Sequence, residues 1–314
     1  MKFPSRVTLQ ESYARVQPHV HQTPILTSKL LNEQAEAELF FKCENFQKMG
    51  AFKMRGAINA ILQLSEVQRK AGVVTHSSGN FGQAVAKAAK ELGVTAYIVM
   101  PQNAPEVKKN GVISYGGLIS ECESTLAARE QAAQEIVRTK GATFLHPSNQ
   151  MEVILGNATA AMELLSKKPN LDYVLCPVGG GGLLAGTALA VYYMGENCKT
   201  IGSEPFAVDD AYRSLQMGKI ALNTTTETVA DGLRTHLGDI NFPIIQQGVS
   251  EIIRVEEDEI ISAMRLIWER MKIVVEPSSA VPLAAVLRSA SLFRQKKVGI
   301  IVSGGNVDLS NLPF

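Results

Sequence analysis

Short apolar runs alternate along the chain with longer amphipathic stretches. We expect strands in the apolar runs, which cover residues 39–42, 72–75, 95–99, 118–120, 143–145, 173–177, 200–203 and 298–302. The amphipathic stretches predict helices, among them 56–64, 82–92, 106–115, 125–139, 156–165 and 258–272. This alternation is typical of parallel sheets with helices on both faces, so we expect an α/β fold. Because the strands fall into an early set within 72–145 and a later set from 173 onward, the pattern suggests two sheets.

The composition narrows the class of protein. Of the 314 residues, 46% are hydrophobic and 19% are charged, as in a packed globular protein. Lysine plus arginine (31) nearly balances aspartate plus glutamate (30), which gives no electrostatic reason to expect nucleic acid or an anionic membrane as a partner. The first 20 residues lack the apolar core of a signal peptide, and no apolar run is long enough to span a bilayer. Four widely spaced cysteines predict free thiols in a reducing cytoplasm.

Sheets of this kind bind ligands at the carboxyl ends of their strands, and four segments there carry candidate chemistry. In the first, residues 45–56, a glycine-bearing turn leads into a helix with Lys53 in its first turn. A cation at that end opposes the helix dipole, which favours a lowered pKa for the amine. A neutral amine attacks an aldehyde, so Lys53 is a candidate nucleophile. A surface lysine is the alternative.

The second segment, residues 75–83, follows a strand and opens a helix. Ser77, Ser78 and Asn80 supply hydroxyl and amide donors there. The free backbone N–H groups at a helix start also bind anions, so we expect a carboxylate to lie here. The alternative is a simple helix cap by Ser77 or Ser78.

The third segment contains four consecutive glycines, residues 179–182, directly after a strand. Such a run is costly in backbone entropy, and it is explained if backbone amides must surround a phosphate at a helix N-terminus. The same residues also satisfy the dinucleotide pattern GxGxxG/A, with Glu204 about 20 residues further on. An NAD-dependent dehydrogenase is therefore an alternative, although it leaves the other three segments unexplained.

The fourth segment, residues 301–308, again follows an apolar strand. Ser303 stands at the strand end, where its hydroxyl could hydrogen-bond a ring nitrogen. The alternative is a tight turn.

Together, in this order, the four segments resemble the fold-type II pyridoxal-phosphate (PLP) enzymes. The most similar group is that of the serine racemases and serine/threonine dehydratases, and the resemblance runs from Thr23-Pro24 to Asp308. Further similar stretches are residues 230–233, 268–272 and 275–277. The combination is specific, although each motif alone is not.

The resemblance implies a role for each matching residue. Lys53 would form the Schiff base with PLP, and Ser303 would face the pyridine nitrogen. The other implied cofactor contacts are Phe52, Asn80, Gly179, Gly180, Gly181, Gly182, Leu183, Gly232 and Glu276. Ser78 would lie on the ring face opposite Lys53, as a second catalytic residue. The implied substrate contacts are Ser77, Ser78, Asn80, Arg129 and Thr235.

The resemblance also implies an architecture. Residues 1–71 and 149–314 would form a large PLP-binding domain with a doubly wound parallel sheet. Residues 72–148 would form a smaller domain, likewise doubly wound with a parallel sheet, that closes over the substrate, so that the whole fold would be like that of the tryptophan synthase β subunit. A homodimer is usual for the resembling group.

A metal site is implied as well, because residues 204–210 are similar to the metal loop of serine racemases. The side chains of Glu204 and Asp210 and the carbonyl of Val208 would hold a divalent ion. Oxygen ligands alone suit Mg²⁺, or Ca²⁺ or Mn²⁺, rather than Zn²⁺. A solvated acidic loop is the alternative.

The sequence departs from the family pattern near the substrate. Phe81 stands where a histidine usually follows Ser-Gly-Asn, and Ser148 stands where racemases often have asparagine. Residues 155–159 read Leu-Gly-Asn-Ala-Thr in place of the usual Ala-Gly-Gln-Gly-Thr. These changes concern the substrate and racemisation more than the cofactor.

Three functions therefore remain open. The first is β-elimination of a small hydroxy amino acid (L-serine, L-threonine or 3-hydroxyaspartate) to a keto acid and ammonia. The second is serine racemisation with dehydration as a side activity. The third is a PLP-binding protein without turnover, for which Phe81 is the one supporting feature.

Overall fold

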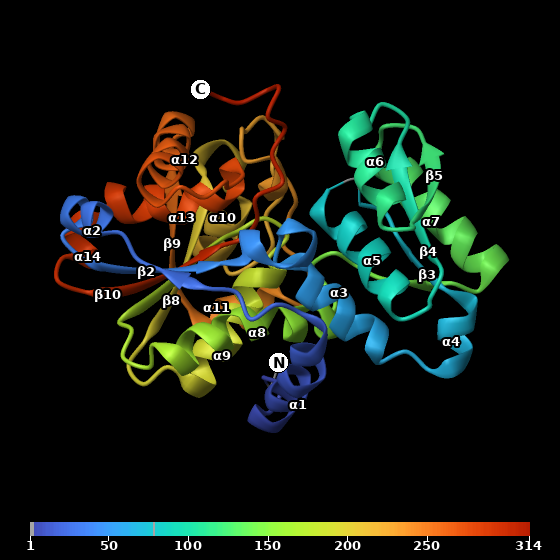
Figure 1. Ribbon diagram of the computed structural model, residues 1–314, viewed down its shortest axis with the longest axis horizontal. Coiled ribbons are helices and arrows are strands. Elements are labelled where there is room, and N and C mark those ends of the chain that lie inside the picture. Colours follow the sequence, from blue (N-terminus) through green and yellow to red (C-terminus); the bar gives the residue numbers. More distant parts are fainter. Residues whose placement is uncertain (1–2, 78) are drawn as a thin grey trace.

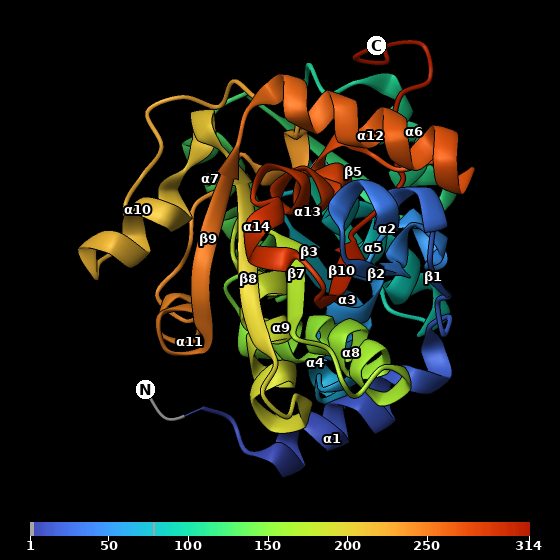
Figure 2. The same cartoon turned by 90° about the vertical axis from the view of Figure 1, so that its left-hand side faces the viewer.

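In the computed structural model, which describes residues 3–77 and 79–314, the chain forms two sheets (Figure 1). The larger sheet has six strands in the order β1-β2-β10-β7-β8-β9, and every neighbouring pair except β1-β2 is parallel. Figure 2 shows these strands side by side in that order. Their bounds are β1 Ile25–Leu26, β2 Glu38–Cys43, β7 Tyr173–Pro177, β8 Lys199–Pro205, β9 Val249–Val255 and β10 Lys297–Val302.

The smaller sheet has four parallel strands in the order β5-β4-β3-β6. They are β3 Val73–Thr75, β4 Ala96–Pro101, β5 Leu118–Cys122 and β6 Thr143–Phe144, with α5 Asn80–Glu91, α6 Glu106–Ser114 and α7 Leu126–Lys140 between them along the chain. All four strands come from residues 73–144, whereas the larger sheet uses residues on either side. The expected α/β fold with parallel sheets is confirmed, while the exact domain borders stay a prediction.

Helices cover both faces of the larger sheet because its strands are apolar on both sides. On β10, Val298, Ile300 and Val302 face one core and Ile301 faces the other, as the two-residue period of a strand requires. Helices α1 Arg6–Val16, α8 Met151–Lys167, α9 Gly182–Met194 and α11 Phe242–Gly248 pack on the Ile301 face. Helices α2 Lys29–Ala35, α12 Glu257–Met271, α13 Pro277–Arg288 and α14 Ala290–Phe293 pack on the other.

The remaining elements are short connections, apart from α3. They are α4 Glu66–Ala71, α10 Asp210–Met217 and the 3₁₀ turns Gln17–His19, Glu44–Phe46, Lys48–Gly50, Phe206–Val208 and Asp231–Leu233. No helix among the described residues is both long and apolar enough to cross a membrane. All four cysteines are free thiols, as expected.

Helix α3 (Lys53–Leu62) lies between the two sheets (Figure 1). It crosses α8 so closely that a Cβ atom on Gly156 would lie 2.4 Å from the Arg55 carbonyl oxygen and 2.7 Å from the Gly56 Cα. Its apolar residues also share a core with α5 of the smaller sheet. Lys53, the first residue of α3, is therefore held at the junction of the two sheets.

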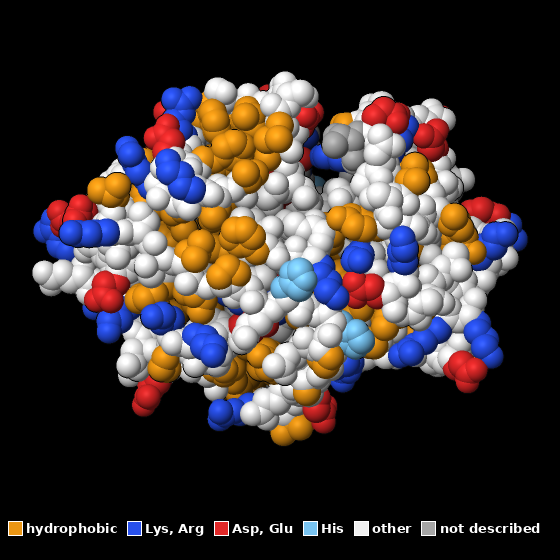
Figure 3. All heavy atoms as spheres, in the orientation of Figure 1, with side chains coloured by type: hydrophobic (Ala, Val, Ile, Leu, Met, Phe, Trp, Pro, Cys, Tyr) orange, Lys and Arg blue, Asp and Glu red, His pale blue; other side chains and the backbone are white. Residues whose placement is uncertain are grey.

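The two parts of the molecule meet around this junction, and Figure 3 shows a notch between them on one face. Several polar contacts join the parts. Lys108 on α6 pairs with Asp231 at 2.8 Å, and Asn80 at the start of α5 donates to the Glu276 carboxylate at the start of α13.

Candidate active site

Lys53 lies partly buried between two aromatic rings. Its Nζ is 5.0 Å from the centre of the Phe52 ring and 5.5 Å from that of the Phe81 ring, and it donates a hydrogen bond to the Pro147 carbonyl at 2.8 Å. Burial lowers the pKa of the Lys53 amine to about 8, against the opposing effect of the Glu276 charge. No side chain caps the N-terminus of α3. At neutral pH an appreciable fraction of this amine is therefore uncharged and nucleophilic.

Asn80 faces Lys53's helix from the smaller part of the molecule. It is the first residue of α5, whose N-cap is Gly79, and no side chain among residues 3–77 and 79–314 caps this helix. The Asn80 Nδ2 donates to both oxygens of Glu276 at 3.0 Å, and Asn306 donates to the Asn80 Oδ1 at 2.9 Å. Burial raises the pKa of Glu276 to about 7, which the Asn80 hydrogen bond opposes. The expected alternative of a serine cap is not found for Ser77, while Ser78 lies outside the described residues.

Ser303 directly follows β10 and lies close to the start of α3. Its carbonyl accepts a hydrogen bond from the Phe52 N–H at 2.9 Å, and its hydroxyl lies 2.9 Å from that of Ser279 on α13. Ser303 is buried, and both neighbouring elements fix its position. A hydroxyl held at this strand end next to the lysine is the arrangement expected for a ring-nitrogen partner.

The four glycines form a tight backbone cradle between β7 and α9. A Cβ atom on Gly180 would lie 2.4 Å from the Ser148 hydroxyl, and one on Gly179 would lie 2.9 Å from the Gly232 carbonyl oxygen. Gly181 has a φ of +80°, a conformation that favours glycine, and it is the N-cap of α9 without a capping side chain. The unpaired N–H groups at this helix start suit an anion such as a phosphate.

Of the other predicted site residues, Gly232, Leu183 and Thr235 lie beside these groups. Gly232 donates its N–H to Ser278 at 3.1 Å, and Leu183 is buried in the first turn of α9. The Thr235 hydroxyl would lie 3.0 Å from a Cβ on Gly180, so it borders the glycine cradle. Arg129 on α7 is partly exposed, and its charge contributes to lowering the pKa of His76, although burial contributes more.

Three residues at the site have no local motif that would have singled them out. Asn241 donates to the Gly180 carbonyl at 2.8 Å and to the Ser148 carbonyl at 3.3 Å, so it ties the glycine cradle to the loop before α8. The His146 Nδ1 accepts from the N–H groups of Ser148 and Asn149, and burial lowers the pKa of His146 to about 4. Ser279 is the third. Each of the three either contacts residues that are distant in the sequence or lies in a loop or helix without a recognisable motif.

The predicted metal ligands lie at the end of β8 and the start of α10. Glu204 accepts from the Tyr212 N–H at 2.6 Å, while its second oxygen is buried without a hydrogen-bond partner among the described residues. Burial raises the pKa of Glu204 well above its usual value and that of Asp210 to about 6. Asp210 accepts from Asn223 and from the Leu237 N–H. Across residues 3–77 and 79–314, no cluster of three or more His, Cys, Asp or Glu side chains could hold a metal.

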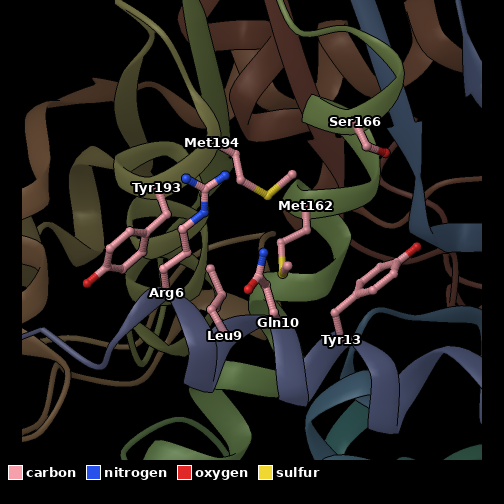
Figure 4. Close-up of a pocket in the computed structure, with 8 residues that line it drawn as sticks. All are labelled: Arg6, Leu9, Gln10, Tyr13, Met162, Ser166, Tyr193 and Met194. Carbon is pink, nitrogen blue, oxygen red and sulfur yellow. The ribbon is translucent and has the colours of Figure 1, made fainter.

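A separate pocket of about 230 Å³ lies between α1, α8 and α9 (Figure 4). Its lining is mostly apolar and aromatic, and it includes Leu9, Tyr13, Met162 and Tyr193. None of the predicted site residues lines this pocket, so we do not associate it with the chemistry at Lys53.

The fold and the site define an α/β enzyme whose partly buried lysine amine, glycine cradle at a helix N-terminus and strand-end hydroxyl suit a phosphorylated carbonyl cofactor. The comparisons specify the cofactor. The model of the family "Pyridoxal-phosphate dependent enzyme" matches residues 16–304. The chain belongs to this family, and the dehydrogenase alternative for the glycine segment is wrong.

The chain is similar over nearly its whole length to characterised members. It is 47% identical to the serine racemase of Dictyostelium discoideum over 97% of this chain and 95% of that protein. It is 45% identical to the beta-hydroxyaspartate dehydratase of Paracoccus denitrificans over the whole of both chains. The solved structure of maize serine racemase matches with a TM-score of 0.94 and 42% identity, covering 97% of this chain and 94% of that one.

The lowered pKa of Lys53 predicts how fast the cofactor-free protein binds PLP covalently. Below about pH 8 the rate should rise roughly tenfold per pH unit, because only the neutral amine attacks an aldehyde, and above it the rate should level off. Rapid-mixing absorbance measurements would follow the attachment. An ordinary lysine, with a pKa of 10.5, would instead give a rate that still rises about tenfold between pH 8 and 9.

Proposed function

We propose that this protein is a PLP-dependent ammonia-lyase that removes the β-hydroxyl and the amino group of a small hydroxy amino acid, giving a keto acid and ammonia. The observation that carries the proposal is the position of Lys53, whose partly neutral amine lies between Phe52 and Phe81 at the junction of the two sheets. The similarity to a beta-hydroxyaspartate dehydratase supports it.

The residues present fit PLP. The glycine cradle and the uncapped start of α9 would hold the phosphate, Asn80 and Glu276 would line the ring, and Ser303 would meet the ring nitrogen. When bound, PLP supplies an electron sink for the charge left when an α-proton departs. Lys53 is the residue we assign as the base, and its Nζ would accept that α-proton.

Ser303 is neutral, and this favours elimination. Beside the ring nitrogen, a serine hydroxyl would not hold a proton there as a carboxylate would, so the electron sink that the cofactor supplies would be weaker. Elimination tolerates this because the hydroxyl can leave as the proton is taken. Ser77, Asn80 and the uncapped start of α5 would bind the substrate carboxylate.

Racemisation is the second candidate function, because several of the most similar relatives are serine racemases. It needs an acid on the ring face opposite Lys53, and Ser78 is the residue we assign there. The side chain at the distal end of the substrate would meet Arg129 and Thr235, which suits a small polar or acidic group.

A panel of hydroxy amino acids tests the function directly. The purified protein should release keto acid and ammonia from at least one of L-serine, L-threonine and 3-hydroxyaspartate, because Lys53 is poised to take the α-proton of each. A coupled keto-acid assay measures the product, and chiral chromatography of the remaining substrate measures racemisation. If the D-isomer forms without keto acid, the protein is a racemase. If neither forms with any substrate, it binds PLP without turnover.

We also propose that Mg²⁺, or Ca²⁺ or Mn²⁺, binds at Glu204, Asp210 and the Val208 carbonyl. One buried oxygen of Glu204 has no hydrogen-bond partner among the described residues, and burial raises the pKa values of both acids, which supports a cation site here. An ion that binds only the folded state stabilises it, so chelation should lower the melting temperature and the activity. Added Mg²⁺, Mn²⁺ or Ca²⁺ should restore both.

Variants make this metal prediction specific. Glu204→Gln should resemble the chelated protein and lose its response to chelator, whereas Glu251→Gln, an exposed acid on the adjacent strand β9, should keep the parent response. If chelation changes neither melting nor rate in the parent protein, residues 204–210 form only an acidic turn.

The assembly is also a proposal. We expect a homodimer, as the resembling group implies, and light scattering of the purified protein would show a mass near twice the 34.0 kDa of the chain. A monomer would contradict it.

A further inference from the structure

Ser279 lies directly behind Ser303. It is fully buried in the first turn of α13, and its Oγ is 2.9 Å from the Ser303 Oγ. Among the described residues, this is the hydrogen bond that the Ser303 hydroxyl makes. The direction in which Ser303 presents its proton therefore depends on Ser279.

The Ser279 hydroxyl has three neighbours and a single hydrogen. It accepts from the Gly304 N–H at 2.7 Å, because an amide can only donate. Its own hydrogen can go to the Gly304 carbonyl at 2.7 Å or to Ser303. The Gly304 carbonyl also accepts from the Glu276 N–H at 3.1 Å, so it keeps a partner when Ser279 donates to Ser303.

The choice between these two acceptors decides where the hydrogen of Ser303 points. When Ser279 donates to Ser303, the Ser303 hydrogen is released to point away from Ser279. The Gly304 amide, Ser279 and Ser303 then form a chain of donors running in one direction, and each bond of such a chain strengthens the next. The Phe52 N–H holds the Ser303 backbone from the other side, at 2.9 Å from its carbonyl oxygen.

We propose that Ser279 is a positioning residue that orients the Ser303 hydroxyl as a hydrogen-bond donor toward the pyridine nitrogen of PLP. Ser279 does not touch the cofactor itself. The inference rests on the proposed function, in which Ser303 meets the ring nitrogen, and it adds the residue that sets the direction of that hydrogen bond. An unprotonated ring nitrogen would accept a hydrogen bond and so needs a donor. By donating to Ser303, Ser279 would leave the Ser303 hydrogen free to serve as that donor.

A double-mutant cycle on PLP binding tests the proposal. Cofactor-free parent, Ser279→Ala, Ser303→Ala and the double variant would each be titrated with PLP, and absorbance of the lysine-bound cofactor gives Kd. Ser279→Ala should raise Kd about tenfold in the parent, the effect of losing one oriented hydrogen bond. In the Ser303→Ala background, the same change should raise Kd less than about twofold. An equal rise in both backgrounds overturns the proposal.

Ser278→Ala is the matched control. Ser278 is a buried neighbour on the same turn, and it likewise accepts from a glycine N–H, that of Gly232. Its effect on Kd should be the same with and without Ser303. If Ser278→Ala couples to Ser303→Ala as strongly as Ser279→Ala does, the effect is general loosening of the helix start, and the proposal fails.

A conservative variant separates the hydroxyl from folding. Ser279→Thr keeps the oxygen and its hydrogen, so a folded Ser279→Thr protein should bind PLP with the parent Kd. Melting of the cofactor-free proteins reports on folding alone. A tenfold loss in Ser279→Thr with unchanged melting would contradict a role for the hydroxyl. If the parent itself binds no PLP, the proposed function fails first, which distinguishes the two failures.

Discussion

Replacing Lys53 with alanine should abolish covalent attachment of PLP and turnover together. The amine that binds the cofactor aldehyde and the base that takes the α-proton are the same group, so no other residue of the site replaces both roles. Loss of a general base alone costs about 10²- to 10⁴-fold in rate, and loss of the attachment adds to it. Absorbance of the purified variant and the keto-acid assay measure the two losses.

Lys48→Ala is the control for Lys53→Ala. Lys48 lies five residues earlier and pairs with Glu91 at 3.1 Å, partly exposed to solvent. Its removal should leave the absorbance of the lysine-bound cofactor and the rate close to those of the parent, with a stability change of about 1 kcal/mol or less. If Lys53→Ala kept normal activity, the assignment of the cofactor lysine would be wrong.

Much of the fold could be predicted because apolar runs mark buried parallel strands. Tyr173–Pro177 was predicted to the residue, and the other expected strands differ from the observed ones by a few residues at their ends. β9 was missed because Glu251 and Arg254 interrupt its apolar pattern at an edge of the sheet. β1 has only two residues, and α13 begins with proline and contains Pro282, which disfavours a helix prediction.

The candidate site could be predicted where its residues follow a strand within one segment. Lys53, the glycine cradle and Ser303 are of this kind, and the structure brings them together. Asn241 and Ser279 could not be found, because they reach the site through contacts 61 and 24 residues apart in the sequence. The helix dipole argument predicted a lowered pKa of Lys53, and in the structure burial is the cause that lowers it.

A buried charge cluster next to the lysine helix gave no signal in the sequence. Arg55, two residues after Lys53, is fully buried, and it donates to both oxygens of Glu44 and of Glu163. Lys42 on β2 completes the cluster by pairing with Glu163. Burial alone would lower the pKa of Arg55, but the two carboxylates outweigh it and raise the pKa. The four charges cancel, and the cluster joins α3 to β2 and α8.

Arg55→Met should therefore cost about 3–5 kcal/mol of unfolding free energy, because it leaves two buried carboxylates with Lys42 as their one remaining cation in the cluster. Urea unfolding of the cofactor-free protein measures the loss. Arg138→Met is the control, since Arg138 makes a similar two-bond pair with Glu135 but is largely exposed, so its loss should stay below about 1 kcal/mol. Equal losses in the two variants would mean that the buried cluster does not fix α3. A larger loss of unfolding free energy in Arg55→Met would mean that the buried cluster fixes α3. The position of Lys53 would then depend on charged residues that do not contact the cofactor or the substrate.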